Sequence, residues 1–116
     1  GRIVRYHGDL APWNVIVNGP SITIIDWEES VPDGYPGVDL AHFALACALH
    51  LRRLAPLAAT AWADAFLART DPAPARQRRA LLLLAAAWHA WRDERDGVRG
   101  HGWVEIVDAL KPSLEA

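Results

Sequence analysis

YHGDLAPWNVIV at residues 6–17 and IIDWE at residues 24–28 are the two stretches that decide the fold of this chain. Between them lies an Asn18-Gly19 pair, which is a strong signal for a tight hairpin turn. The runs on both sides of this pair are rich in β-branched residues, as strands are. We therefore expect a β-hairpin whose strands span residues 14–17 and 22–26.

The hairpin would bring together two side chains that carry oxygen. Asn14 opens its first strand and Asp26 closes its second. Amide and carboxylate oxygens are hard ligands, which Mg²⁺ takes when phosphates and water fill its other positions. Asp9 would stay free of the metal and could accept a proton. Taken singly, each of these residues is more simply explained as a turn or strand-end residue that bonds to nearby backbone.

The three polar residues stand in a joint pattern: His7-x-Asp9, then Asn14 five residues later, then a strand that ends in Ile-Asp-Trp around Asp26. The pattern resembles the aminoglycoside phosphotransferase and choline kinase-like family of small-molecule kinases. The resemblance implies that Asp9 is the catalytic base and that Asn14 and Asp26 bind Mg²⁺. It implies that His7 belongs to the catalytic loop as the residue that orients it. The implied reaction transfers the γ-phosphoryl group of ATP or GTP to a hydroxyl of an aminoglycoside-, choline- or sugar-like acceptor.

The resemblance extends to Asp39-Leu40-Ala41, which matches a buried Asp-Leu-Ala at the start of the next helix in the family. It implies that Asp39 holds the catalytic loop by hydrogen bonds. A helix N-cap is a second role that is compatible with the first. The preceding loop departs from the commonest family pattern, because Tyr35-Pro36-Gly37 replaces a Gly-Asp-Pro.

Three carboxylates, those of Glu28, Glu29 and Asp33, follow the second predicted metal ligand. Their charge would attract a cationic acceptor such as an aminoglycoside or choline. The alternative is that they are ordinary solvated loop charges.

The composition limits the classes of partner and compartment. A chain of 116 residues with 52% apolar residues can bury a core as one domain. A net charge of −2 gives no electrostatic signal for nucleic acid or for an anionic membrane. The longest apolar run, residues 80–88, is too short to span a bilayer. Cys47 is the single cysteine, predicted to be a buried small hydrophobe, and this fits a reducing compartment, so we expect a soluble cytoplasmic protein.

The sequence also lacks groups that a kinase uses to bind nucleotide phosphates. Its only lysine is Lys111, and no G-x-G-x-x-G occurs. It begins at Gly1, directly before a strand-like run at residues 2–6. We therefore expect residues 1–116 to be the C-terminal, catalytic lobe, with the N-terminal nucleotide lobe absent from this chain, and we expect the isolated chain to be inactive.

The expected fold class is α+β. A small β-hairpin that carries the catalytic loop would pack on a mainly helical bundle, as in the C-terminal lobe of a protein-kinase-like phosphotransferase. Residues 28–38 read as a loop without periodicity. A helix from Asp39 to about Leu54 is apolar nearly all round and should be buried at the centre. Further helices are expected at about 56–69, 75–96 and 102–110.

Histidine and tryptophan residues on these helices allow two interpretations. His42 and His50 are eight residues apart, whereas metal-binding pairs on one helix are usually four apart, so packed and hydrogen-bonded histidines are favoured over a metal site. Trp88 and Trp91 have helical spacing and are interpreted as core or lobe-contact residues rather than as a ligand box.

Two rival functions remain open. A catalytically silent kinase-like fragment or interaction module is favoured by the missing phosphate-binding groups. A metal-dependent phosphoesterase is a weaker alternative, in which His7, Asp9 and Asp26 would ligate a metal pair. The sequence has no additional histidines near Asp26 that such a site would use.

Overall fold

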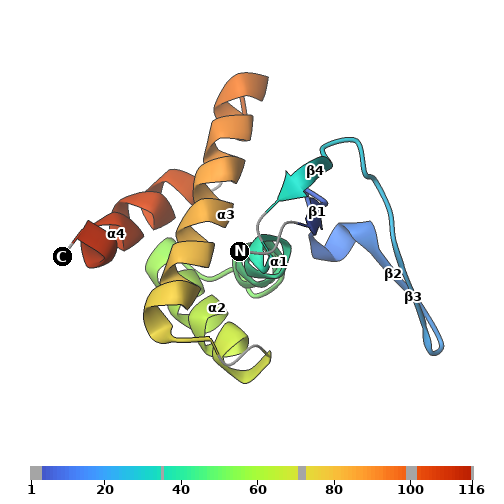
Figure 1. The fold of residues 1–116 in the computed structure, drawn as a ribbon, viewed down its shortest axis with the longest axis horizontal. Helices are drawn as coiled ribbons and strands as arrows, with labels where there is room; N and C mark the ends of the chain where they lie inside the picture. The colour runs from blue at the N-terminus through green and yellow to red at the C-terminus, as the bar shows by residue number, and fades with distance from the viewer. Residues whose placement is uncertain (1–3, 35, 71–72, 99–101, 116) are drawn as a thin grey trace.

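Four α-helices and two small sheets make up the part of the chain that the structure, a computed structural model, describes, namely residues 4–34, 36–70, 73–98 and 102–115 (Figure 1). The strands all lie before residue 35 in the chain, and the α-helices all lie after it. This segregation is typical of an α+β fold. The expected α+β class is confirmed. Residues 2 and 3 of the predicted first strand, and Tyr35, lie outside the described residues.

The helices form a bundle around α1, Val38–Ala46, which Figure 1 shows nearly end-on. Both α2, Pro56–Thr70, and α3, Ala75–Asp96, pack on α1, while α4, Trp103–Glu115, packs on α3 and α2. The expected burial of the first helix is thereby confirmed. Small side chains let these helices approach closely, and the buried core includes Ala41, Ala44, Leu45, Ala63, Leu82, Ala85, Ala86 and Ile106.

Proline and glycine set the helix ends. Pro56 begins α2, where its missing N–H would have no intrahelical partner in any case. Gly97 ends α3 in a left-handed conformation, φ 71°, and the N–H of Val98 donates to the carbonyl of Asp93 at 2.8 Å. The predicted bounds of α2 and α3 are therefore confirmed to within one residue. By contrast, α4 continues past its predicted end to Glu115.

The first helix does not continue to Leu54 as expected. After Ala46 the chain makes a π-helical turn, Cys47–Leu51, and such a turn takes an extra residue and shifts the direction in which the next side chains point. Cys47 is half-buried rather than buried. Burial raises the pKa of its thiol, so the thiol is protonated at neutral pH and serves as a packing group.

The strands form two antiparallel pairs. The expected hairpin is confirmed, because β2, Val15–Asn18, pairs with β3, Ser21–Ile24, in the register Val15 opposite Ile24. Its predicted bounds are wrong, since Asn14 ends a 3₁₀ turn, Pro12–Asn14, and Asp26 lies beyond the end of β3. The interpretation of residues 28–38 as a loop is wrong in part, because β4, Val31–Gly34, pairs with β1, Val4–Tyr6. The partner strand stabilises β4, whose own proline and glycine do not favour a strand.

The β2–β3 hairpin extends away from the helices (Figure 1), so the expectation that it packs on the helical bundle is wrong. Val17 and Ile22 on its two strands are each 68% exposed. Trp13 and Trp27 at its base are about half-exposed. The hairpin therefore contributes little burial of its own, and its position depends on contacts at its base. In the described part of the chain, no helix is both long and apolar enough to cross a membrane.

Candidate functional site

The loop between β1 and β2 is held by the first turn of α1. Asp39 accepts hydrogen bonds from the backbone N–H of His7 at 2.7 Å and of Gly8 at 3.2 Å, one on each carboxylate oxygen. The N-cap of α1 is Gly37, so the alternative role of Asp39 as the N-cap is wrong. Asp39 instead lies inside the first turn, where a negative charge is favoured by the helix dipole.

His7 is buried and connects the loop to the end of the hairpin. Its Nδ1 lies 3.1 Å from the backbone N–H of Asp9 and must accept, so its Nε2–H donates to the carbonyl of Ile25 at 2.9 Å. The ring also lies 4.5 Å from that of Trp27. Both ring nitrogens are engaged with backbone, so His7 can orient Asp9 relative to Asp26 but offers no free nitrogen to a metal.

Asn14 is buried and contacts Asp9. Its Nδ2 donates to the backbone carbonyl of Asp9 at 2.8 Å and lies 3.3 Å from Oδ2 of the Asp9 carboxylate. Because these contacts use the amide nitrogen, the side-chain oxygen of Asn14 remains for a cation. The N–H of Ile25 donates to the carbonyl of Asn14 at 2.9 Å, which brings the end of β3 to the start of β2.

Asp26 directly follows Ile25, whose backbone N–H donates to the carbonyl of Asn14. Asp26 is exposed, and its φ of 61° is left-handed. Non-glycine residues in this conformation are uncommon, although Asp and Asn tolerate it best, and they often occur at functional sites. The hairpin therefore brings the backbones of the two predicted metal ligands to neighbouring positions, and each side chain carries an oxygen that can ligate a cation.

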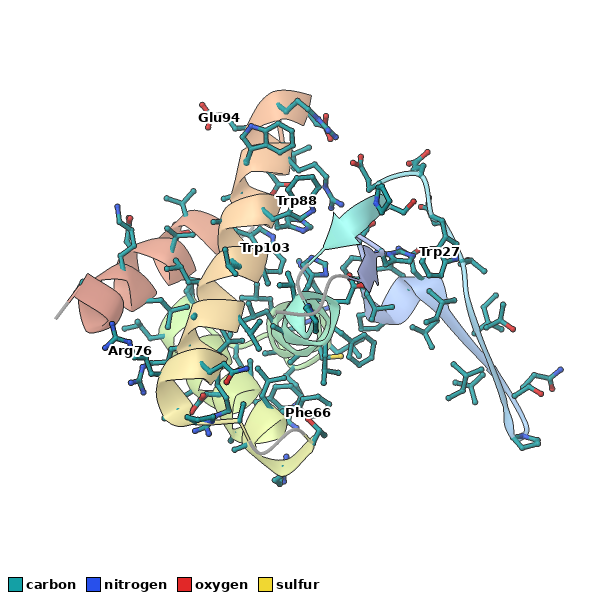
Figure 2. The ribbon with its side chains drawn as sticks, viewed as in Figure 1. Trp27, Phe66, Arg76, Trp88, Glu94 and Trp103 are labelled. Atoms are coloured by element: carbon teal, nitrogen blue, oxygen red, sulfur yellow. The ribbon has the colours of Figure 1, made fainter. Side chains whose placement is uncertain are left out.

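An arginine that sequence reasoning missed contacts the predicted base. Arg92 of α3 donates from Nη2 to Oδ1 of Asp9 at 3.0 Å, and from Nη1 to the carbonyl of Gly8 at 3.1 Å. Trp88 donates to the same carbonyl at 3.0 Å from Nε1, and Figure 2 shows it on the side of α3 that faces β1 and β4. Trp88 thus contacts the loop as well as the core. Trp91, which was expected to be in the core or at a lobe contact, is about half-exposed.

Two buried histidines, His42 and His89, contact each other, and His89 also contacts Arg92. His42 donates from Nδ1 to the carbonyl of Leu10 at 2.7 Å, and its Nε2 lies 2.8 Å from Nδ1 of His89. The His89 ring stacks on Trp103 at 4.2 Å. Burial lowers the pKa of His42, so its ring is neutral near pH 7. His42 is therefore packed and hydrogen-bonded, as expected, and the ring of His50 packs edge-on to Trp13 at 5.2 Å and lies 6.3 Å from the ring of Trp103.

The side chains of Asp9, His42 and His89 place possible metal-ligand atoms within 4.8 Å of one another. The guanidinium of Arg92 lies among them, with Nη2 3.0 Å from Asp9 and 3.3 Å from either ring nitrogen of His89. His42 uses both of its nitrogens in hydrogen bonds. The cationic side chain of Arg92 thus takes the position that a metal ion would need. The cluster binds this guanidinium instead of a metal.

The acidic loop is partly neutralised. Glu29 forms an ion pair with Arg95 of α3 at 2.9 Å, and Arg95 also contacts Asp96 at 2.9 Å. Glu28 is exposed, and the side chain of Asp33 lies outside the part that the structure describes. Of the three carboxylates predicted to attract a cation, Glu29 therefore already has a protein partner.

Comparison with known families gives one match. The model of the phosphotransferase enzyme family matches residues 1–82, which is more than half of the chain. The chain belongs to the phosphotransferase enzyme family. No significant match was found among curated proteins or among solved structures.

Membership in the phosphotransferase enzyme family confirms the resemblance drawn from the motif. The matched residues include the loop with Asp9 and Asn14, the end of the hairpin with Asp26, and the first turn of α1 with Asp39. They end within α3, before Arg92. A buried polar residue at a core-facing position was the signal for Arg92, because Leu82, Ala85, Ala86, His89 and Arg92 share the buried face of α3.

Proposed function

We propose that this chain forms the metal- and acceptor-binding half of a kinase-like phosphotransferase that moves the γ-phosphoryl group of ATP or GTP to a hydroxyl of a small molecule. The family supports phosphoryl transfer in general. The observation that carries the finer proposal is the contact of Asn14 with Asp9, because it leaves an amide oxygen for a cation beside a fixed carboxylate.

Asp9 is proposed as the base. Arg92 occupies one of its oxygens, and the other oxygen retains room to accept a hydrogen bond from an acceptor hydroxyl. As the hydroxyl oxygen bonds to the γ-phosphorus, the bond from that phosphorus to the β,γ-bridging oxygen breaks and a nucleoside diphosphate leaves. The hydroxyl proton passes to the carboxylate of Asp9, and such proton transfer contributes typically ~10²–10⁴-fold to the rate.

Asn14 and Asp26 are proposed to hold Mg²⁺. The donor set fits, because one amide oxygen and one exposed carboxylate are hard oxygen ligands and leave other coordination positions for phosphate oxygens and water. Bound Mg²⁺ would neutralise charge on the transferring phosphates. His7 keeps the two halves of the site together through Asp9 and Ile25.

The nucleotide phosphates would need further donors. The chain's one lysine, Lys111, is on α4, and it has no glycine-rich phosphate loop. We infer that a separate N-terminal nucleotide lobe supplies these groups, and that the chain alone transfers no phosphate. The exposed apolar residues of the hairpin, such as Ile22 and Val17, are the surface proposed to contact that lobe.

The acceptor is proposed to approach along the loop that contains Glu28. An exposed carboxylate beside Asp26 favours a cationic alcohol, such as an aminoglycoside- or choline-like molecule. A metal-dependent phosphoesterase is less consistent with the geometry, because both ring nitrogens of His7 are engaged with backbone. A silent interaction module would have the same fold but no selective cation site.

The experiment follows the effect of Mn²⁺, a paramagnetic substitute for Mg²⁺, on the amide signals of the ¹⁵N-labelled chain with and without ATP. We expect broadening centred on Asn14 and on residues 25–27, and we expect Asp26→Ala to remove it. Asp108→Ala, which removes an exposed carboxylate on α4, should leave the broadening unchanged. Broadening that is centred elsewhere, or that survives Asp26→Ala, would contradict the proposed metal site.

A further inference from the structure

We propose that Arg92 is the positioning residue for Asp9, held in place by the His42–His89 pair; this inference rests on the proposed function of Asp9 as the base. Arg92 lies outside the residues that the family model matches. It comes from the last third of α3, more than eighty residues from Asp9 in the sequence.

The guanidinium fixes Asp9 at two points. Nη1 binds the carbonyl of Gly8, the residue before Asp9, and Nη2 binds the Asp9 carboxylate. A planar guanidinium holds its donors in a rigid fork, so the two contacts together restrict both the backbone and the side-chain torsion of Asp9. The side chains of Arg92 and Asp9 are only 11% and 17% exposed, so water competes weakly for this ion pair.

The histidine pair connects the guanidinium of Arg92 to a second point of the loop. His42 donates from Nδ1 to the carbonyl of Leu10, so its neutral Nε2 must accept from Nδ1–H of His89. Nη2 of Arg92, which donates to Asp9, lies 3.3 Å from both ring nitrogens of His89. Nε2 of His89 also faces Oδ1 of Asp93 at 3.4 Å. These contacts thus connect the loop at Leu10, through His42 and His89, to the guanidinium that binds Asp9.

These contacts account for the group of polar side chains where the loop meets α1 and α3, namely Asp9, His42, His89 and Arg92. A buried arginine costs free energy unless each of its donors has a partner. Here the guanidinium of Arg92 contacts Gly8, Asp9 and His89. It fixes Oδ1 of Asp9, while Oδ2, which Asn14 contacts at 3.3 Å, keeps room for the acceptor hydroxyl. The arrangement satisfies the charge and also sets the direction in which the base points.

The test measures phosphoryl transfer by a phosphotransferase that contains this chain. Arg92→Ala should lower kcat by about 100-fold, the loss that a misplacement of about 1 Å can cause. The KM values for nucleotide and acceptor should change by less than about threefold, because Arg92 touches neither. Arg92→Lys keeps the charge but not the fork, so it should recover part of the lost turnover.

Two further variants separate positioning from a general loss of stability. In an Asp9→Asn background, Arg92→Ala should cause no further loss, since it acts through the Asp9 carboxylate. Arg78→Ala removes another arginine of α3, which pairs with Asp64 at 2.9 Å away from the loop, and it should leave kcat unchanged. Losses that multiply in the double variant, or equal losses in Arg92→Ala and Arg78→Ala, would overturn the proposal.

Amide hydrogen exchange on the isolated chain decides the positioning claim independently of activity. Arg92→Ala should accelerate exchange at Gly8 and Asp9 by about tenfold or more, through easier local opening, and Arg78→Ala should not. Unchanged exchange at these amides would overturn the inference. An enzyme without phosphoryl transfer but with accelerated exchange would refute the proposed function and leave the positioning role of Arg92 supported.

Discussion

The helical bundle and the segment that carries the site are stabilised in different ways. The helices bury a continuous core of alanine and leucine side chains, whereas Ala11 is the only buried apolar residue among the described side chains before residue 35. The site segment is held instead by hydrogen bonds to side chains of the bundle. Asp39 accepts from the backbone of the segment, and His42, Trp88 and Arg92 donate to it. The bundle thus provides the stability, and polar contacts to it provide the geometry of the site.

The largest expected difference between the two regions concerns apolar truncation. Leu45→Ala in α1 removes a fully buried side chain and should lower the free energy of unfolding by about 2–5 kcal/mol. Ile22→Ala in β3 removes an exposed side chain and should change it by less than about 0.5 kcal/mol. Urea denaturation of both variants measures this. Similar losses would show that the hairpin is part of the folding core.

A smaller loss of stability is expected from a substitution at Gly8, where the site loop meets the backbone of Glu29. Gly8 has φ +87°, and a Cβ there would lie within 2.3 Å of the carbonyl oxygen of Glu29. Gly19 in the hairpin turn has φ +58° with open space around it. Both alanine variants incur backbone strain, but Gly8→Ala should destabilise the chain by about 1–3 kcal/mol more. Equal melting temperatures for the two variants would show that the loop is free to move away.

The smallest expected effect is a dependence of stability on pH. Burial lowers the pKa of His42 in the folded state below its usual value of about 6.5. Below that pH the unfolded chain binds the proton more readily, so stability falls by up to about 1.4 kcal/mol per pH unit until the folded pKa is reached. His42→Gln should flatten this slope between pH 6.5 and 5 in chemical denaturation. An unchanged slope would mean that other groups cause it.

Local sequence signals were sufficient for most elements. Asn18-Gly19 predicted the hairpin, although its turn is formed by Gly19 and Pro20. Pro56 predicted the start of α2, and the apolar periodicity of residues 75–96 predicted the full length of α3. β4 could not be predicted, because its four residues include proline and glycine and pair only with a strand about 27 residues earlier. Short strands of this kind are set by tertiary pairing rather than by their own sequence.

The sequence predicted the site residues of the loop, the hairpin and the first turn of α1, but not the one on α3. Asp9, Asn14, Asp26 and Asp39 stand in a compact motif, so sequence reasoning could name them, although their proposed roles remain to be tested. Arg92 stands on a helix whose pattern indicates packing, and nothing local connects it to the loop. A polar residue at a buried position of α3 was a signal that something must satisfy it, but the partner is set by how α3 packs on α1.

Turnover of the Asp9→Asn variant tests the central claim most directly. In a phosphotransferase that contains this chain, Asp9→Asn keeps the shape of the side chain but removes its ability to accept a proton. It should lower kcat by ~10²–10⁴-fold with little change in the KM for the nucleotide. Asp108→Asn on the exposed face of α4 is the matched control and should match the parent. A kcat for Asp9→Asn within about threefold of the parent would contradict the assignment of Asp9 as the base.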